Sequence, residues 1–295
     1  MTTDPVSPGY KPFDPDPKAP ALALPPGACD AHCHVFGPQA AFPFAPERRY
    51  TPVDAGKDRL FALHRHLGLD RAVLVQASCH GTDNRAMLDA IAASEGTVRG
   101  VAMVGPEVTD AELRALHEGG VRGVRFNFVA HLGEDADPAA VETIAARIAD
   151  LGWHLVLHFD AAKLPGLAPF LRGLPVPMIV DHMGRVDASA GLEQEPFRLL
   201  LGLMEDERFL VKVCGAERIS RTGAPFRDAV PFAARLVELF PDRCLWGTDW
   251  PHPNIRGDMP DDGHLVDLLA EIAPSEDARR RILVDTPTRL YWADA

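Results

Sequence analysis

Eight short apolar segments recur along the chain, and a segment with helical character follows almost every one. The apolar segments are predicted strands at 28–36, 72–77, 100–104, 121–128, 154–159, 177–183, 209–214 and 243–248. Predicted helices lie at 59–67, 85–93, 110–118, 138–151, 163–172, 196–204, 226–240, 264–272 and 277–284. Most of the strands are unbroken apolar runs, which is typical of parallel strands buried on both faces. The alternation predicts an α/β fold, and eight units predict a (β/α)8 TIM-type barrel.

The alternative α/β architecture is an open, doubly wound sheet. No G-x-G-x-x-G or P-loop sequence follows any predicted strand, so the commonest signatures of that alternative are missing. We therefore expect one barrel domain over 27–295, because a barrel of this class commonly takes about 250 residues. Residues 1–26 are rich in Pro, Asp and Lys and carry no apolar signal-peptide core, which predicts an irregular N-terminal arm.

Charge and cysteine content exclude several classes of partner. The formal net charge is −12, which argues against nucleic acid or an anionic membrane as a partner, although a local arginine cluster can still bind a small anion. No segment reaches the roughly 20 apolar residues that span a bilayer. The five cysteines form no C-x-x-C pair, which favours reduced thiols in a cytoplasmic protein. Cys29 and Cys33 are expected to face away from the side of their strand that carries His32 and His34.

Polar residues collect at the carboxyl ends of the predicted strands, where barrels of this class place their functional groups. His32 and His34 form an H-x-H at the end of the first strand, and residues two apart in a strand face the same side. The other strand-end residues are Ser78, His80, Arg125, Asn127, His158, His182, Arg218 and Asp249. The same parity argument puts His182 on the face of Met178 and Val180, and Asp249 on the face of Leu245 and Gly247.

The residue types indicate hydrolytic chemistry. His32, His34, His158 and Asp249 are predicted to hold one divalent ion, zinc or manganese, with a coordination position left for water. Asp249 is the expected general base, and His182 is expected to orient a carbonyl or stabilise an oxyanion. The forked guanidinium groups of Arg125 and Arg218 suit carboxylates or sulfonates.

Five motifs together resemble the amidohydrolase superfamily and, more narrowly, its 2-pyrone-4,6-dicarboxylate hydrolase group of lactonases. In chain order they are D-A-H-C-H-V-F-G, Q-A-S-C-H-G-T-D-N, G-V-R-F-N-F, I-V-D-H-M-G-R and W-G-T-D-W-P-H-P-N. The resemblance runs from about Pro25 to the C-terminus. It implies a distorted barrel and hydrolysis of a lactone ring in bacterial catabolism of aromatic compounds.

The resemblance also implies roles for single residues. Asp249 becomes the base that activates water, and His32, His34 and His182 become the groups that polarise the lactone carbonyl. The positions that match the surroundings of the substrate are Tyr50, Ser78, His80, Arg125, Arg185, Arg218 and Asn254.

The chain departs from the pyrone hydrolase pattern at two positions. His158 stands where that pattern has a tyrosine at the end of the fifth strand, and His131 stands where it has an arginine after R-F-N-F. Superfamily members with a histidine on this strand generally use it as a metal ligand, whereas the tyrosine-bearing members are thought to work without a metal. His131 is accordingly a substrate-binding position at which one anionic group is held differently.

These departures favour 4-sulfomuconolactone, or a close analogue, as the substrate of a zinc-dependent hydrolase acting on a carboxylic ester bond. The alternative is hydrolysis of 2-pyrone-4,6-dicarboxylate, for which catalysis without a metal stays open. Further alternatives are a decarboxylase of the same superfamily, a sugar lactonase and a barrel that only binds an anion. A small anionic lactone is the expected partner, and the sequence leaves the oligomeric state open.

Overall fold

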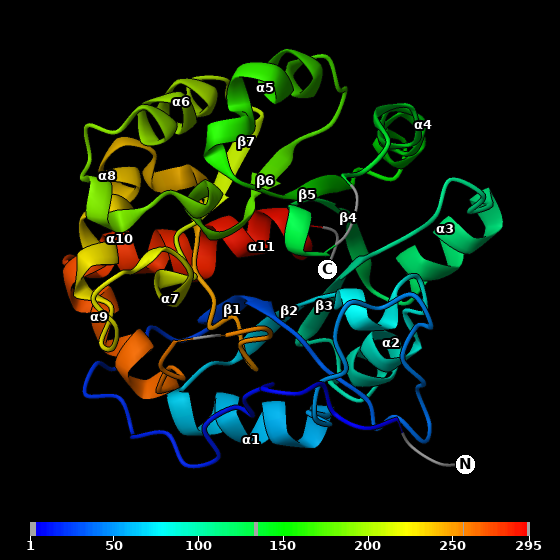
Figure 1. Cartoon of the computed structure of the whole chain (residues 1–295), viewed down its shortest axis with the longest axis horizontal. Helices are drawn as coiled ribbons and strands as arrows, with labels where there is room; N and C mark the ends of the chain where they lie inside the picture. The colour runs from blue at the N-terminus through cyan, green and yellow to red at the C-terminus, as the bar shows by residue number, and fades with distance from the viewer. Residues whose placement is uncertain (1–3, 133–134, 256, 294–295) are drawn as a thin grey trace.

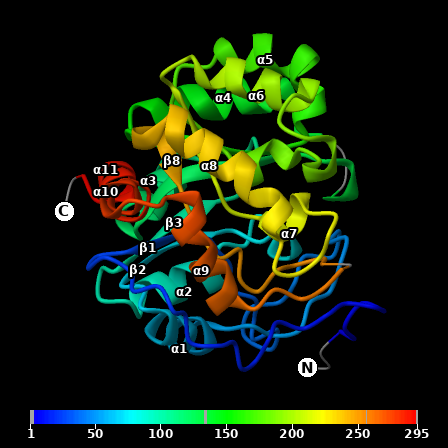
Figure 2. The same cartoon turned by 90° about the vertical axis from the view of Figure 1, so that its left-hand side faces the viewer.

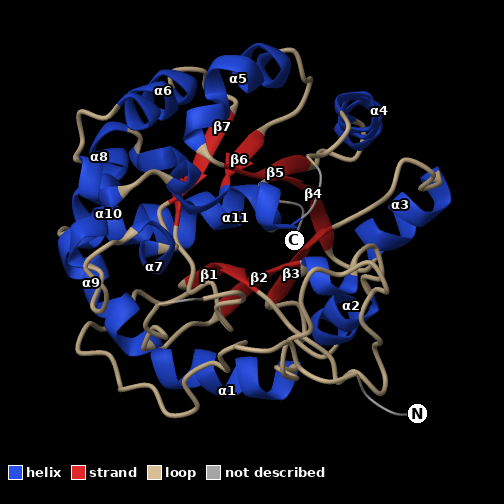
Figure 3. Cartoon of the chain, in the orientation of Figure 1, coloured by secondary structure: helices blue, strands red, loops and turns tan. Residues whose placement is uncertain are grey.

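A computed structural model describes residues 4–132, 135–255 and 257–293, and it confirms the barrel. Eight parallel strands pair in chain order from β1 to β8, and the helices lie around them (Figures 1 and 3). The strands are β1 (Cys29–Cys33), β2 (Arg71–Val75), β3 (Val98–Ala102), β4 (Val121–Phe128), β5 (His154–Phe159), β6 (Met178–Val180), β7 (Phe209–Lys212) and β8 (Cys244–Leu245).

The helices match the predicted ones except for one short helix and the segment near the C-terminus. They are α1 (Lys57–Leu67), α2 (Arg85–Ala92), α3 (Asp110–Glu118), α4 (Pro138–Ala149), α5 (Leu164–Arg172), α6 (Glu195–Met204), α7 (Ala216–Ile219), α8 (Val230–Leu239), α9 (Asp262–Ile272), α10 (Glu276–Arg280) and α11 (Thr286–Tyr291). The helix predicted over 277–284 ends at Arg280, and a π-helical segment, Arg281–Asp285, links it to α11. The four-residue helix α7 is too short to leave a periodic signal in the sequence.

Two apolar layers separate the inside of the barrel from its outside. The inner layer comprises Cys29, Ala31, Val73, Val75, Val101, Val156, Ile179, Leu210, Leu245 and Tyr291. The outer layer lies between the strands and the helices. Tyr291 comes from α11 at one end of the barrel (Figure 2), where its hydroxyl lies 3.0 Å from Nε2 of His154. His154 is therefore structural, and the opposite end of the barrel remains for the site.

A β-bulge in β1 aims both histidines of the H-x-H into the barrel. Asp30 pairs with Ala72 and Cys33 with Leu74, so β1 carries one residue more than β2 between the two pairs. The expectation for the cysteines is confirmed for Cys33, which lies in the outer layer, and wrong for Cys29, which lies inside. The bulge is the reason, because it breaks the strict alternation of the strand. All five cysteines are buried free thiols.

Strand β8 is much shorter than the predicted strand, and backbone hydrogen bonds from the segment after it close the barrel. The amides of Ala31 and His34 donate to the carbonyls of Trp246 and Trp250 at 2.8 Å each. The amide of Asp249 donates to the carbonyl of His32 at 2.7 Å. This seam therefore holds β1 and the residues that follow β8 directly against each other.

The N-terminal arm runs over the barrel without helix or strand between residues 4 and 26. Phe13 packs on Trp250 with ring centroids 4.9 Å apart, and Lys18 pairs with Asp267 at 2.5 Å. Among the described residues, no helix is both long and apolar enough to cross a membrane.

Candidate active site

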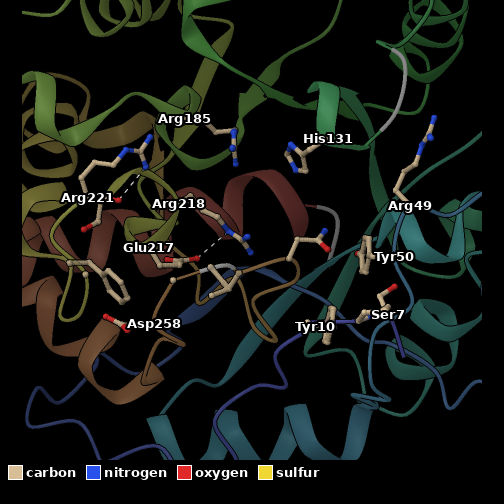
Figure 4. Close-up of a pocket in the computed structure, with 18 residues that line it drawn as sticks. Ser7, Tyr10, Arg49, Tyr50, His131, Arg185, Glu217, Arg218, Arg221 and Asp258 are labelled. Carbon is tan, nitrogen blue, oxygen red and sulfur yellow. Dashed lines mark hydrogen bonds and ion pairs between the residues drawn. The ribbon is translucent and has the colours of Figure 1, made fainter. Parts of the chain in front are cut away.

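Two adjoining cavities lie at the carboxyl ends of the strands. The inner one has a volume of about 30 Å³ and the outer one about 870 Å³. Residues that line both are Tyr50, His131, Arg185, Arg218 and Asn254. The inner cavity holds roughly one or two water molecules, so only the outer cavity has room for a ring-sized ligand. Figure 4 shows the outer cavity, with Arg185 and His131 above Arg218 and with Tyr10 and Tyr50 on one side.

Asp249 lines the inner cavity, where it faces three histidines and one arginine. Its Oδ1 faces Nε2 of three histidines, at 3.3 Å from His34, 3.5 Å from His32 and 4.0 Å from His182. Its Oδ2 accepts hydrogen bonds from the Arg218 guanidinium at 2.7 Å. One carboxylate oxygen is thus fixed by an arginine, and the other is directed at the histidine cluster.

Electrostatics keep this carboxylate ionised. Burial alone would raise the pKa of Asp249, but Arg218, His182 and His34 together hold that pKa well below its ordinary value. Burial lowers the pKa of His182 well below its ordinary value, and it lowers the pKa of His32 to about 3 with help from Lys212. At neutral pH, the neutral imidazoles of His32 and His182 therefore lie beside the anionic Oδ1 of Asp249.

Backbone turns, and not strand parity, bring His182 and Asp249 to the site. Met178 and Val180 lie in the outer layer while Ile179 lies in the inner layer, so the predicted shared face of Val180 and His182 is wrong. β6 ends at Val180, and His182 enters the cavity because its φ of 50° turns the chain. Asp249 likewise has a φ of 66° beyond the end of β8. Left-handed backbone at non-glycine residues is uncommon and clusters at functional sites.

The geometry of His34 fits a bound cation. Its Nδ1–H donates to the Val75 carbonyl at 2.7 Å, so in the neutral ring Nε2 carries a lone pair. That lone pair faces Asp249 Oδ1 at 3.3 Å. Two acceptors at this distance match two ligands of one zinc ion, whose bonds of about 2.0–2.2 Å set tetrahedral ligands roughly 3.3 Å apart.

Three of the four predicted metal ligands come together. His32, His34 and Asp249 place their ligand atoms within 4.8 Å of one another, and the Nε2 atom of His32 is buried without a hydrogen-bond partner among the described residues. His158 is in none of the ligand groups that the described residues form. Its Nδ1 lies 3.2 Å from the Asn127 side-chain oxygen, and its Nε2 is buried without a described partner. His158 and His182 are neighbours, with ring centroids 5.5 Å apart.

A buried ionic network under the histidines was not predicted from the sequence. Lys212 is fully buried, and its Nζ lies 2.8 Å from Nδ1 of His32 and 3.1 Å from Oδ1 of Asp181. Arg125 holds the other oxygen of Asp181 at 3.1 Å. Burial opposes ionisation of Asp181, yet Lys212, His32 and Arg125 hold its pKa well below the ordinary value. The available signal was one lysine at the end of an otherwise apolar strand, F-L-V-K.

A second buried network lies behind Arg218. His252 stands between Asp262, at 3.1 Å, and Glu217, at 3.6 Å, and all three side chains are essentially inaccessible. Burial lowers the pKa of His252, but the two carboxylates outweigh it and raise that pKa to about 10. Glu217 is also 3.3 Å from Nε of Arg218, so this network supports the arginine that holds Asp249.

The remaining predicted residues divide into two groups. Tyr50, Ser78, Arg125, His131, Arg185, Arg218 and Asn254 line the inner cavity. His80 lines neither cavity: Nε2 accepts from the Gly37 amide at 3.2 Å, and Nδ1 lies 3.2 Å from the Pro43 carbonyl. His80 thus contacts the loops of Gly37 and Pro43, because it belongs to the 3-10 turn Ser78–His80 that follows β2.

Comparisons with known proteins agree with this fold. The amidohydrolase family profile matches residues 29–292. A 2-pyrone-4,6-dicarboxylate hydrolase of Comamonas testosteroni is 52% identical, covering 98% of this chain and 97% of its own. A 4-sulfomuconolactone hydrolase of Rhizobium radiobacter is 43% identical, covering 92% of each chain. The crystal structure of a probable 2-pyrone-4,6-dicarboxylic acid hydrolase from Acinetobacter baumannii, with citric acid bound, superposes with a TM-score of 0.80 at 28% identity, covering 90% of this chain and 99% of its own.

Proposed function

The chain belongs to the amidohydrolase family, and from this premise we propose that it hydrolyses the lactone ring of 2-pyrone-4,6-dicarboxylate. The observation that carries the proposal is the arrangement of Asp249 and its histidines at the floor of a cavity lined by three arginines, Arg125, Arg185 and Arg218. A dicarboxylate needs several such donors, whereas a neutral sugar lactone does not. The comparisons also support this substrate better than the sulfonated lactone expected from the sequence, since the pyrone hydrolase is the more similar relative.

The described residues offer groups for the first step of such a hydrolysis, the attack of water on the ring carbonyl, after which the ring C–O bond breaks. Asp249 is ionised, and its Oδ1 is directed into the inner cavity, where it would accept the proton of an attacking water molecule. His182 lines the same cavity and would stabilise charge that develops on the carbonyl oxygen. Arg185 and Arg218 line both cavities and would hold the carboxylates of the ring.

A divalent metal ion fits the site, and we propose His32, His34 and Asp249 as its ligands, with His158 as a fourth. The paired acceptors of His34 and Asp249 and the unpartnered Nε2 atoms of His32 and His158 support this. When bound, such an ion would supply Lewis-acid polarisation of the lactone carbonyl. Elemental analysis of the purified protein, with turnover measured before and after chelation, tests the assignment: one equivalent of zinc or manganese and restorable activity are expected. Full activity in metal-free protein would refute it.

The 4-sulfomuconolactone reaction is the second candidate, and two residues favour it. His131 lines both cavities at their rim, where partial burial of its ring and the nearby Arg185 and Arg218 lower its pKa to about 4, so it offers no fixed positive charge. His158 supplies an imidazole where the pyrone hydrolase pattern has a phenol. The difference at His131 changes how one anionic substituent is held, and the difference at His158 adds a candidate metal ligand.

The test is a direct comparison of kcat/KM on the two lactones, with the product analysed in each case. We expect the pyrone dicarboxylate to be opened at least tenfold more efficiently and to gain one water without loss of CO2. A preference for the sulfonated lactone would make 4-sulfomuconolactone hydrolysis the assigned function. Release of CO2 would exclude both hydrolytic reactions and indicate a decarboxylase. The variant H131R should improve the pyrone substrate further, because it adds the positive charge that His131 lacks.

A further inference from the structure

We infer that Lys212 and Asp181 form a tautomer switch for His32, which lets Nε2 of this histidine present either an N–H group or a lone pair for a metal ion. The inference builds on the proposed role of His32, and it assigns a positioning function to a buried lysine. Lys212 touches neither cavity, so it would act through His32 and not on the substrate.

The switch follows from what faces Nδ1 of His32. Lys212 makes a hydrogen bond of 2.8 Å with that nitrogen, and Oδ1 of Asp181, which has no hydrogen-bond partner among the described residues, lies 3.2 Å from it as a second possible partner. A neutral imidazole carries one proton. If Nδ1 accepts from Lys212, the proton is on Nε2. If Nδ1 donates to Asp181, Nε2 has a free lone pair.

The two states suit two occupants of the inner site. With the proton on Nε2, His32 presents an N–H to the inner cavity, on the side of Asp249 Oδ1, which lies 3.5 Å away without a hydrogen bond in this structure. With the lone pair on Nε2, His32 presents a ligand atom beside those of His34 and Asp249. A carboxylate behind a ligating histidine is a common arrangement, because it fixes the ring and raises the basicity of the ligand. The unusual feature here is the competing ammonium group.

Lys212 remains in place in either state. Its Nζ is 3.1 Å from Asp181 Oδ1, so the ammonium group keeps a carboxylate partner when it releases Nδ1. Arg125 neutralises the second oxygen of Asp181 at 3.1 Å. The position of the His32 proton therefore changes without leaving a buried charge unpaired, which would otherwise be costly.

Two measurements that need no turnover test the switch. The first is 15N NMR of histidine-labelled, metal-free protein, in which we expect His32 to carry its proton on Nε2 and to move it to Nδ1 when zinc is added. The second is zinc affinity by competition with a chelating indicator. K212M should bind zinc about tenfold more tightly, because the competing donor is removed, and D181N about tenfold more weakly.

The control is K57M, which removes a partly exposed lysine, far from the histidines, from its ion pair with Asp89 and should leave zinc affinity unchanged. Thermal unfolding of every variant shows whether it is folded. A metal-free His32 with its proton on Nδ1, a K212M protein with unchanged or weaker zinc affinity, or a wild-type protein that binds no zinc would each overturn the inference. Absence of lactonase activity in the wild type would refute the proposed function alone, because neither measurement uses a lactone.

Discussion

Replacing Gly247 by alanine is predicted to damage the seam that closes the barrel. Gly247 does not have a left-handed backbone, so the cost of a side chain there is steric. A Cβ atom at this position would lie 2.4 Å from the backbone nitrogen of His32 and 2.7 Å from Oδ1 of Asp30. Ordinary contact begins at 3.4 Å, so the two segments must separate by about 1 Å, the difference between 3.4 and 2.4 Å.

The atoms that a Gly247→Ala side chain would meet cannot easily move. Asp30 is fully buried and accepts hydrogen bonds from the Thr248 amide at 3.0 Å and the Thr248 hydroxyl at 2.6 Å, and it lies 3.1 Å from Nε2 of His64. We therefore expect a loss of about 3 kcal/mol in the free energy of unfolding, at the upper end of typical overpacking costs. Because the seam also joins His32 to Asp249, kcat should fall by about 100-fold.

Urea unfolding followed by circular dichroism, with kcat measured in parallel, tests this prediction. The matched control is G202A on helix α6, where an added Cβ meets nothing within 4 Å. Since glycine weakens a helix interior, G202A should gain about 0.5–1 kcal/mol of stability and keep its activity. If G247A unfolds within 1 kcal/mol of the wild type, the argument that close approach at the seam holds the site together is refuted.

Three further predictions concern single side chains. D249N should still fold and unfold cooperatively, although with lower stability because Arg218 loses a carboxylate partner, while kcat falls by about 100-fold or more because the proton acceptor is lost; steady-state turnover near the wild-type rate would remove Asp249 from the mechanism. R125M should raise KM for a dicarboxylate lactone by about tenfold, because a charged donor that lines the inner cavity is lost. The change in kcat should be smaller, since Asp181 keeps Lys212 as its partner. An unchanged KM would mean that Arg125 binds no substrate anion. The fold raises the pKa of His252 from 6.5 to about 10, so its contribution to stability is full below pH 6.5 and is lost as the pH rises through 10. H252Q should therefore show a flatter dependence of the free energy of unfolding on pH between 7 and 10. Equal slopes in H252Q and the wild type would contradict this.

The sequence was sufficient to predict the barrel and the end at which its site lies. Each apolar run is long enough to be recognised, and parallel strands in a barrel bring their carboxyl ends to one face. Arg125 and Asn127 are confirmed on one face of β4, where they contact Asp181 and His158. These outcomes depend on local periodicity, which a single sequence records.

Tertiary structure decided the features that depend on turns and on long-range pairing. His182 and Asp249 reach the site through left-handed backbone that follows their strands, and His80 is turned away by a 3-10 segment, so strand parity could not place any of them. Lys212 is paired with residues 31 and 180 positions away in the chain, and that partnership has no local signal. A sequence pattern reports which face of an element a residue occupies, whereas hydrogen bonds between distant segments determine what that residue meets there.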